Sequence, residues 1–221
     1  MKKSVKLLSL LALCAGFSTV AAAEGVFVGG SLDAQHTKIK DSDCEPGENC
    51  SLSSGRMGLG LKAGYDFGQF RVYGQYQHNF KAKTSETSDY YYNGQLTSRD
   101  EGEYSWTTND LTVGAVYTPS FTDNFKGLVG GYLGYSKFKY KYNVQHYDSQ
   151  GIYRKTGADS WSANGFLYGM RLGGIYSFNQ NNELEFGVKA EQVRYKAKED
   201  GESFKFKSNN YGAFVGYNYK F

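Results

Sequence analysis

The sequence has little proline, little cysteine and little net charge. Two prolines and three cysteines occur in 221 residues, and 25 Lys+Arg against 22 Asp+Glu leave a formal charge of +3. So small an excess gives no footprint for nucleic-acid binding, which needs a strongly basic surface. Long apolar runs are also scarce, because the one candidate lies at the extreme N-terminus. A polytopic helical membrane protein, which needs repeated runs of about 20 apolar residues, is therefore excluded.

Aromatic residues and glycine are abundant instead. Phe, Trp and Tyr make up 17% of the chain, with 20 Tyr and 15 Phe, and there are 28 Gly. That much aromatic surface can be buried, which argues against a disordered chain. Aromatic residues favour strands over helices, and proline, which would interrupt strands, is rare. The composition predicts an all-β protein with one large domain or two small ones.

The first 23 residues are organised like a secretory signal peptide. A lysine-rich start precedes the apolar run 7–20, and three alanines end at Ala23. We expect cleavage after Ala23, which leaves a mature domain of residues 24–221. A lipoprotein signal is disfavoured, because Leu13 rather than a small residue precedes Cys14.

Two cysteines, Cys44 and Cys50, remain in the expected mature chain. An exported pair in an oxidising compartment is expected to form a disulfide. Residues 45–49 are Glu-Pro-Gly-Glu-Asn, a turn composition that can bring the two ends together. A metal site is the alternative, but no His or further Cys nearby completes a tetrahedral ligand set. We expect no metal and no other cofactor.

Eight segments of the mature chain alternate apolar and polar residues with a period of two. Successive side chains of a strand point to opposite faces, so each segment has one apolar face and one of Gly, polar and charged residues. In 57–67, Met, Leu, Leu, Ala, Tyr and Phe alternate with Gly, Lys and Asp. The segments are 26–35, 57–67, 70–80, 111–118, 125–142, 166–177, 184–191 and 211–221.

Three features favour a membrane barrel over a soluble sandwich, which also alternates. Tyr and Phe of the apolar face lie near strand ends, as in interfacial girdles. The polar face mixes Gly with both signs of charge, which suits the narrow inside of a small barrel. Short connections alternate with longer ones, at 37–55, 81–105, 143–160 and 198–202. We predict an all-β, eight-stranded antiparallel up-and-down transmembrane β-barrel, closed between its first and last strands.

The C-terminal run Tyr217-Asn218-Tyr219-Lys220-Phe221 resembles the C-terminal signature of bacterial outer-membrane barrels. With the signal peptide and eight strands, the whole mature chain is similar to the OmpA-like and opacity-type barrel superfamily. The resemblance implies an integral outer-membrane protein of a Gram-negative bacterium, whose Tyr217, Tyr219 and Phe221 are recognised by the barrel-assembly machinery. It also implies a surface antigen with a structural or adhesion-type role. The partners that follow are outer-membrane lipid, lipopolysaccharide and host surface molecules.

The polar faces predict a lumen filled by balanced charges. An eight-stranded barrel is just wide enough for side chains to fill, and buried charges must be paired. We predict a cross-barrel ionic network that plugs the bore. Its members are Asp33, Lys62, Arg71, Asp110, Arg171, Lys189 and Glu191; Asp66, Glu185 and Lys220 share their face.

A second group of cations is expected to face outward above the membrane. These side chains can bind lipopolysaccharide phosphates by charge, or they can simply keep a strand edge soluble. The group is Lys137, Lys139, Lys141, Arg194, Lys196, Lys205 and Lys207. Residues 84–105 hold three successive tyrosines, Tyr90 to Tyr92, which either contact neighbouring molecules or pack over the barrel mouth.

Three other functions stay open: a narrow porin-like channel, an enzyme that modifies lipid A or phospholipid, and a soluble lipid carrier in the periplasm. Catalysis of the hydrolase type needs Ser, His and a carboxylate. Residues 146–149, His-Tyr-Asp-Ser, contain all three types, but adjacency in sequence is no sign of a triad. No G-x-S-x-G motif is present either. We therefore predict a protein without enzymatic activity and without a nucleic-acid partner.

Overall fold

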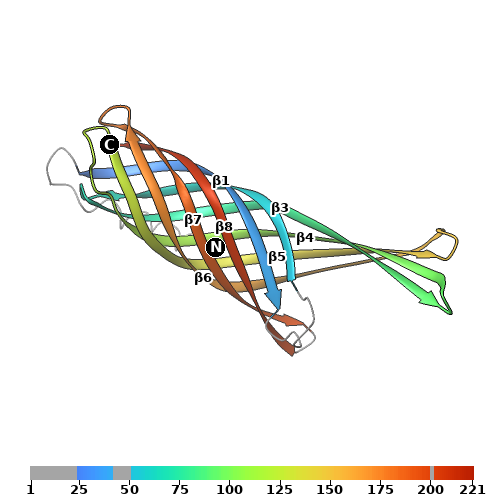
Figure 1. Ribbon diagram of the computed structural model, residues 1–221. Helices are drawn as coiled ribbons and strands as arrows, with labels where there is room; N and C mark the ends of the chain where they lie inside the picture. Colours follow the sequence, from blue (N-terminus) through green and yellow to red (C-terminus); the bar gives the residue numbers. More distant parts are fainter. Residues whose placement is uncertain (1–23, 42–50, 200–201) are drawn as a thin grey trace, which may run out of the picture.

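Eight long strands form nearly all of the structure. The computed structural model describes residues 24–41, 51–199 and 202–221. Each strand pairs antiparallel with the next one, and β1 also pairs with β8, so the ring closes (Figure 1). The predicted closed, eight-stranded antiparallel barrel is confirmed. The strands are β1 (Gly25–Asp41), β2 (Ser51–Asp66), β3 (Phe70–Tyr92), β4 (Gln95–Tyr117), β5 (Phe125–Asp148), β6 (Tyr153–Ser177), β7 (Asn182–Glu199) and β8 (Glu202–Lys220).

The described chain holds no helix that is long and apolar enough to span a bilayer.

The closing seam joins the first and last strands, as predicted. Its register runs from Phe27 opposite Lys220 to Asp41 opposite Phe206. Glycine is needed at one point of this seam, because a Cβ on Gly29 would lie 2.2 Å from Asn218 Oδ1 and 2.7 Å from the Tyr217 carbonyl oxygen. A closed ring leaves no sheet edge unpaired over this length.

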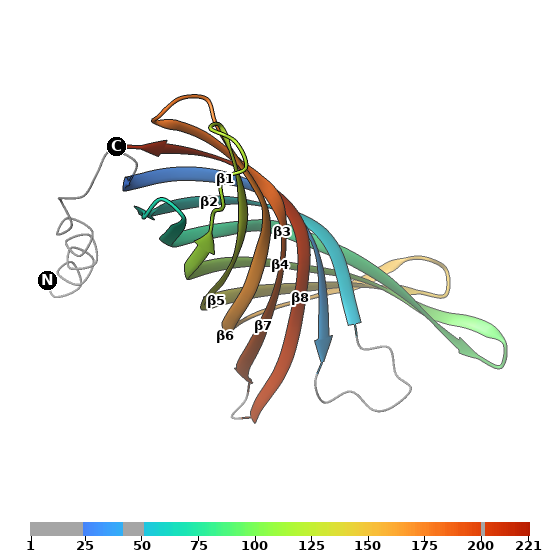
Figure 2. The same ribbon diagram turned by 60° about the vertical axis from the view of Figure 1, so that its left-hand side comes forward.

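Short turns lie at one end of the barrel, together with the C-terminus (Figure 2). In the β2–β3 turn, Gly68 has a φ of +84°, which a residue with a Cβ rarely adopts. Its amide donates a hydrogen bond of 2.8 Å to Asp66 Oδ1, the usual way in which Asp stabilises a tight turn. We call this end of the barrel the turn end.

The opposite end corrects the sequence analysis, because the predicted loops 81–105 and 143–160 are mostly strand. Pairing of β3 with β4 continues to Tyr92 opposite Gln95, and that of β5 with β6 to Tyr147 opposite Tyr153. β2 leaves β3 at Asn79, so four strands continue beyond the ring (Figures 1 and 2). We call these segments, 81–92, 95–105, 141–148 and 153–163, the protruding sheet. Apart from inward side chains next to the ring, namely Ala82, Tyr104, Trp161 and Ala163, both of its faces are largely polar, so apolar periodicity does not reveal it.

The outer surface of the barrel is apolar between the turn end and the protruding sheet. Aliphatic side chains form its middle, and aromatic side chains flank them on both sides. We call this surface the apolar belt. Its exposed aliphatic residues are Val28, Leu32, Met57, Leu59, Leu61, Val72, Leu111, Val113, Val129, Leu133, Met170, Leu172, Val188 and Val215. Exposed aromatic residues near the turn end include Phe67, Phe70, Tyr117, Tyr176, Tyr219 and Phe221; those near the other end include Tyr76, Phe80, Tyr135, Phe166 and Tyr211.

Candidate functional site

Inside the belt, the lumen is filled by charged side chains. Glu185 on β7 is the centre of one group: its carboxylate lies 2.5 Å from Lys62 Nζ and 3.0 Å from Arg171 Nη1. Asn218 Nδ2 donates a further hydrogen bond of 3.1 Å to Glu185 Oε2. All four side chains are buried. Because a buried carboxylate is stable only when paired and hydrogen-bonded, this group ties β2, β6, β7 and β8 together across the lumen.

A second group lies nearer the turn end. Arg71 forms a two-pronged pair with Glu183, with Nη1 and Nη2 each 2.8 Å from one carboxylate oxygen. Nη2 also lies 2.8 Å from Asp66 Oδ2, to which Lys220 Nζ lies 3.1 Å away. Lys126, half-buried, donates to the Gly68 carbonyl oxygen at 3.4 Å. Sequence reasoning did not include Glu183, although its position two residues before Glu185 places it on the same face.

A third group lies nearer the protruding sheet. Lys189 Nζ is 2.8 Å from Asp33 Oδ1 and 3.8 Å from Glu191 Oε2. Asp110 is held differently: it accepts hydrogen bonds from Asn79 at 2.6 Å and from Ser136 at 2.5 Å. The seven predicted lumen residues thus belong to three groups of ion pairs and hydrogen bonds, and Gln75 and Gln77 join the first and third groups by hydrogen bonds with Arg171 and Lys189. Arg56, which donates to Thr108 Oγ1 at 3.0 Å, is a further buried cation that sequence reasoning did not include.

Aromatic rings surround the central guanidinium. The Arg171 guanidinium carbon lies 4.8 Å from the centroid of Phe214, 5.1 Å from that of Tyr73 and 5.6 Å from that of Tyr132. A cation over a ring face is attracted by the ring quadrupole, more strongly when water is excluded. These contacts and the ion pairs fill the middle of the lumen with fixed polar groups.

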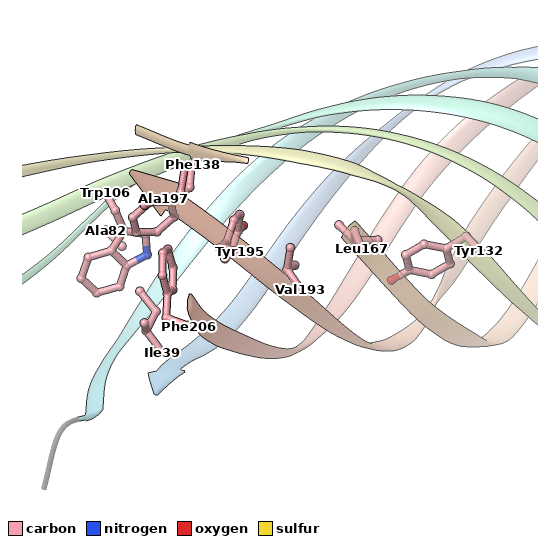
Figure 3. Close-up of a cluster of buried hydrophobic side chains, with 11 residues drawn as sticks. Ile39, Ala82, Trp106, Tyr132, Phe138, Leu167, Val193, Tyr195, Ala197 and Phe206 are labelled. Atoms are coloured by element: carbon pink, nitrogen blue, oxygen red, sulfur yellow. The ribbon is translucent and has the colours of Figure 1, made fainter. Parts of the chain in front are cut away.

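Above this charged layer, the lumen changes character. The inward-facing side chains become apolar, several of them aromatic, and they pack against one another (Figure 3). Phe206 is central: its ring centroid lies 4.8 Å from that of Tyr195 and 5.2 Å from that of Phe138. Trp106 is also fully buried here. We call this cluster the aromatic layer; its buried members are Ile39, Ala82, Trp106, Phe138, Ala163, Tyr195, Ala197 and Phe206, with Leu167, Val193 and Tyr132 below them.

The seven predicted outward cations are all exposed. Several of them line up across neighbouring strands at the upper rim of the belt. Lys137 is opposite Asn164, which is opposite Lys196, and Lys196 is opposite Lys205. A second row, one step lower, joins Arg194 to Lys207 and Lys207 to Lys40. Like charges placed directly opposite repel each other, and these rows concentrate positive charge at the rim.

The predicted assembly residues lie on the outside of the turn end. Tyr217, Tyr219 and Phe221 are exposed, and the rings of Tyr219 and Phe221 are 5.1 Å apart. Tyr217 also donates a hydrogen bond to Asn182 of the neighbouring strand. All three therefore belong to the apolar belt.

The tip of the protruding sheet carries the three successive tyrosines, which are exposed rather than packed over the barrel mouth. Two acidic side chains organise the hairpin tips. A hydrogen bond from Arg99 lowers the pKa of Asp89 below its ordinary range. In the β5–β6 turn, a hydrogen bond from the Ile152 amide, with a further contribution from Arg154, lowers the pKa of Asp148.

Two of the three histidines have polar side-chain partners among the described residues. His78 Nδ1 lies 2.8 Å from Asn109 Oδ1, and His146 contacts Asp100 on the protruding sheet. Neither of these contacts includes a serine. Among the residues that the structure describes, no cluster of His, Cys, Asp and Glu is suited to hold a metal ion.

Two predictions concern segments outside the described residues. These are the signal peptide, residues 1–23, and the disulfide between Cys44 and Cys50, which falls in 42–50. Both stay predictions, as does the domain boundary at residue 24.

No protein-family model and no curated protein matches this chain. Solved structures give matches of low sequence identity. The attachment invasion locus protein Ail of Yersinia pestis is 17% identical, covering 88% of this chain and 98% of that one, with a TM-score of 0.42. Neisserial surface protein A is 16% identical, covering 88% and 97%, with a TM-score of 0.39. The outer membrane protein OprG from Pseudomonas aeruginosa is 13% identical, covering 89% and 96%, with a TM-score of 0.42.

Proposed function

We propose that this chain is an integral protein of a bacterial outer membrane, with a closed lumen and a surface-exposed interaction sheet. One observation carries the proposal: the barrel is apolar outside and charged inside over the height of the belt. In water, this arrangement would expose large aliphatic side chains and bury many charges. In a bilayer it satisfies both faces, because hydrocarbon contacts the belt and the closed ring leaves no backbone group unpaired.

The barrel would stand with its turn end in the periplasm and its protruding sheet outside the cell. An exported chain with two periplasmic ends requires an even strand number, which the eight strands provide. Tyr217, Tyr219 and Phe221 would then lie at the periplasmic rim, where the assembly machinery would recognise them. The exposed tyrosines at the tip of the protruding sheet suit contacts with neighbouring or host molecules, because aromatic side chains are enriched in interfaces.

The rows of cations at the upper rim suit lipopolysaccharide phosphates. Strands in a sheet are about 4.8 Å apart, so the row from Lys137 to Lys205 spans about three such steps, which matches a cluster of phosphates rather than one. Within the described residues, Lys139, Lys196 and Lys205 form no ion pair with an acidic side chain. Cations on the protruding sheet differ, because Arg99 pairs with Asp89 and Arg154 with Asp148.

The lumen favours a structural or adhesion-type role over a channel. The ion pairs of the charged layer and the rings of the aromatic layer occupy successive levels of the bore. These side chains leave no wide water-filled path along the lumen, so a stable, large ion conductance through the barrel is not expected. Planar-bilayer recordings should therefore show no stable, large open state; such a state would favour the narrow porin-like channel instead.

Location and orientation are tested on whole cells. A protease-cleavable tag inserted after Gly94, at the β3–β4 tip, should be cut in intact cells, and the same tag inserted in the turn 120–124 should be protected. Heat-modifiable migration on gels after detergent extraction should accompany this result. Recovery of the processed chain as a dispersed species in plain buffer would contradict the proposal and favour a periplasmic carrier.

Lipopolysaccharide binding is tested by charge removal. Lys139→Gln, Lys196→Gln and Lys205→Gln together should reduce lipopolysaccharide retention on native gels. The matched control is Lys83→Gln, Arg99→Gln and Arg154→Gln, which removes three cations that already have acidic partners. Equal retention by both triple variants and the unaltered protein would reject the lipopolysaccharide site.

A further inference from the structure

The lumen opens above the aromatic layer into a cavity of about 300 Å³. Residues from seven of the eight strands line it, among them Tyr104 on β4, Tyr140 on β5, Trp161 on β6 and Phe204 on β8. Its volume lies at the lower end of the range for small-molecule sites, which is roughly 300–1,000 Å³. The cavity therefore suits a compact ligand of a few non-hydrogen atoms.

The rings present their faces in different directions. Tyr140 and Trp161 have centroids 5.0 Å apart at an interplanar angle of 32°, whereas Trp161 and Phe204 are 5.2 Å apart at 84°. Trp161 and Phe204 thus meet edge to face and form a corner instead of a closed stack. Each face carries the negative part of the ring quadrupole, which attracts cations.

One carboxylate lies with these rings. Among the described residues that line the cavity, Glu86 is the charged one. Its charge is close enough to affect Tyr104, whose pKa rises to about 12 because of burial first, then the neighbouring Tyr142, and then Glu86. The cations of the same region point the other way: Lys137, Lys139 and Lys141 alternate with the inward rings of β5 and are exposed outside. The cavity lining thus carries one carboxylate, that of the exposed residue Glu86, whereas the lysines of β5 lie on the outer face.

We propose that this cavity binds a small organic cation with a methylated ammonium group, of the choline class. Methyl groups on the ammonium contact ring faces, where a cation gains both dispersion and quadrupole attraction. Glu86 supplies the opposite charge, and the aromatic layer below closes the cavity. The inference does not rest on the membrane location proposed above. It uses only the residues that line the cavity on the inside of the barrel.

Intrinsic fluorescence can detect the ligand directly. The chain has two tryptophans; Trp161 lines the cavity and Trp106 is buried in the layer beneath it. Folded full-length protein in a non-ionic maltoside detergent would be titrated with choline and, separately, with 3,3-dimethylbutan-1-ol. In this alcohol a carbon replaces the choline nitrogen, so shape is kept and charge is removed.

Choline should change the tryptophan emission in a saturable way, and the uncharged alcohol should bind at least about tenfold more weakly. Glu86→Gln should weaken choline binding several-fold. Glu101→Gln, which removes an exposed carboxylate of the protruding sheet that does not line the cavity, is the matched control and should leave binding unchanged. Tyr140→Leu should weaken binding further, and heat-modifiable migration would show that each variant is folded.

Three results would overturn the proposal. Equal binding of choline and the alcohol would identify an uncharged apolar site. Equal weakening by Glu86→Gln and Glu101→Gln would show that Glu86 acts only through the overall electrostatic potential of the protein and not as a contact of the ligand. The absence of a saturable signal in the folded protein would remove the site altogether.

Discussion

The lower and upper halves of the barrel wall have opposite polarity. On β5, Val129 and Leu133 face outward in the lower half, but Lys137 and Lys139 occupy the same face higher up. The inner face changes in the reverse sense on β7, where Glu185, Lys189 and Glu191 are followed by Val193 and Tyr195. The strands continue without interruption through this change, so backbone geometry does not cause it.

The reversal shows where the surrounding medium changes. In the lower half, apolar side chains contact the exterior and charges are enclosed, which suits hydrocarbon outside. In the upper half, charges are exposed and aromatic rings are enclosed, which is the ordinary arrangement of a protein in water. One barrel thus has two kinds of interior, and substitutions should behave differently in each.

The largest effect is expected from breaking the charged layer. Glu185→Ala leaves Lys62 and Arg171 buried without their carboxylate, and it should lower the free energy of unfolding by about 3–5 kcal/mol. Urea titration of the heat-modifiable band in detergent measures this change. Glu101→Ala, at an exposed position, should stay within about 0.5 kcal/mol of the unaltered protein. A loss below 1 kcal/mol at Glu185 would contradict the role of the ion pairs.

The apolar belt should tolerate charge poorly. Leu61, 64% exposed at mid-height of β2, contacts hydrocarbon in our account. Leu61→Arg should therefore cost about 2–4 kcal/mol for the barrel in phospholipid vesicles. Ser85→Arg places the same side chain on the outward face of the protruding sheet, opposite Glu103, and should have little effect. A similar loss of stability at both positions would contradict the claim that the lower half contacts hydrocarbon and the upper half contacts water.

The aromatic layer should respond more gently than the charged layer. Phe206→Leu removes part of a ring but leaves no unpaired charge, so a loss of about 1 kcal/mol is expected. The same urea titration measures it, and Phe67→Leu on the exposed turn end serves as control. A loss as large as that of Glu185→Ala would mean that ring packing, rather than charge pairing, dominates the stability of the lumen.

The smallest effect concerns pH at the β5–β6 tip. Because the folded pKa of Asp148 is lower than its unfolded value, its contribution is present above the unfolded pKa and is lost as pH falls through the folded pKa. Hydrogen exchange of the Ile152 amide should therefore be more protected at pH 5 than at pH 2, after correction for the intrinsic rate. Asp148→Asn should reduce that difference; an unchanged profile would contradict it.

Sequence reasoning identified the barrel because each spanning strand repeats one strong signal. Lipid-facing residues such as Leu59 and Leu61 alternate with Gly60 and Lys62, and the same phase holds along β7 and β8. The protruding sheet was missed because its strands, such as 84–92, are polar on both faces. In these segments strand formation depends on the neighbouring strands with which they pair, and amino-acid composition does not identify those neighbours.

The candidate site was harder to predict than the fold. Arg56 and Glu183 follow the inward phase and could have been found from it. The aromatic layer could not, because the apolar face was equated with the lipid face throughout. Phe138 and Phe206 contradict that rule, since they lie on the inner face above the level where polarity reverses. Which side chains form ion pairs across the lumen, as Lys62 and Glu185 do, depends on how the barrel closes in three dimensions.

The reversal itself can be measured along one strand. In a Cys44→Ser, Cys50→Ser background, single cysteines at Val129, Leu133, Lys137 and Lys141 would carry a spin label in phospholipid vesicles. Labels at 129 and 133 should be relaxed mainly by oxygen, which concentrates in hydrocarbon, and labels at 137 and 141 mainly by a water-soluble nickel complex. Water-like relaxation at all four positions would contradict the account.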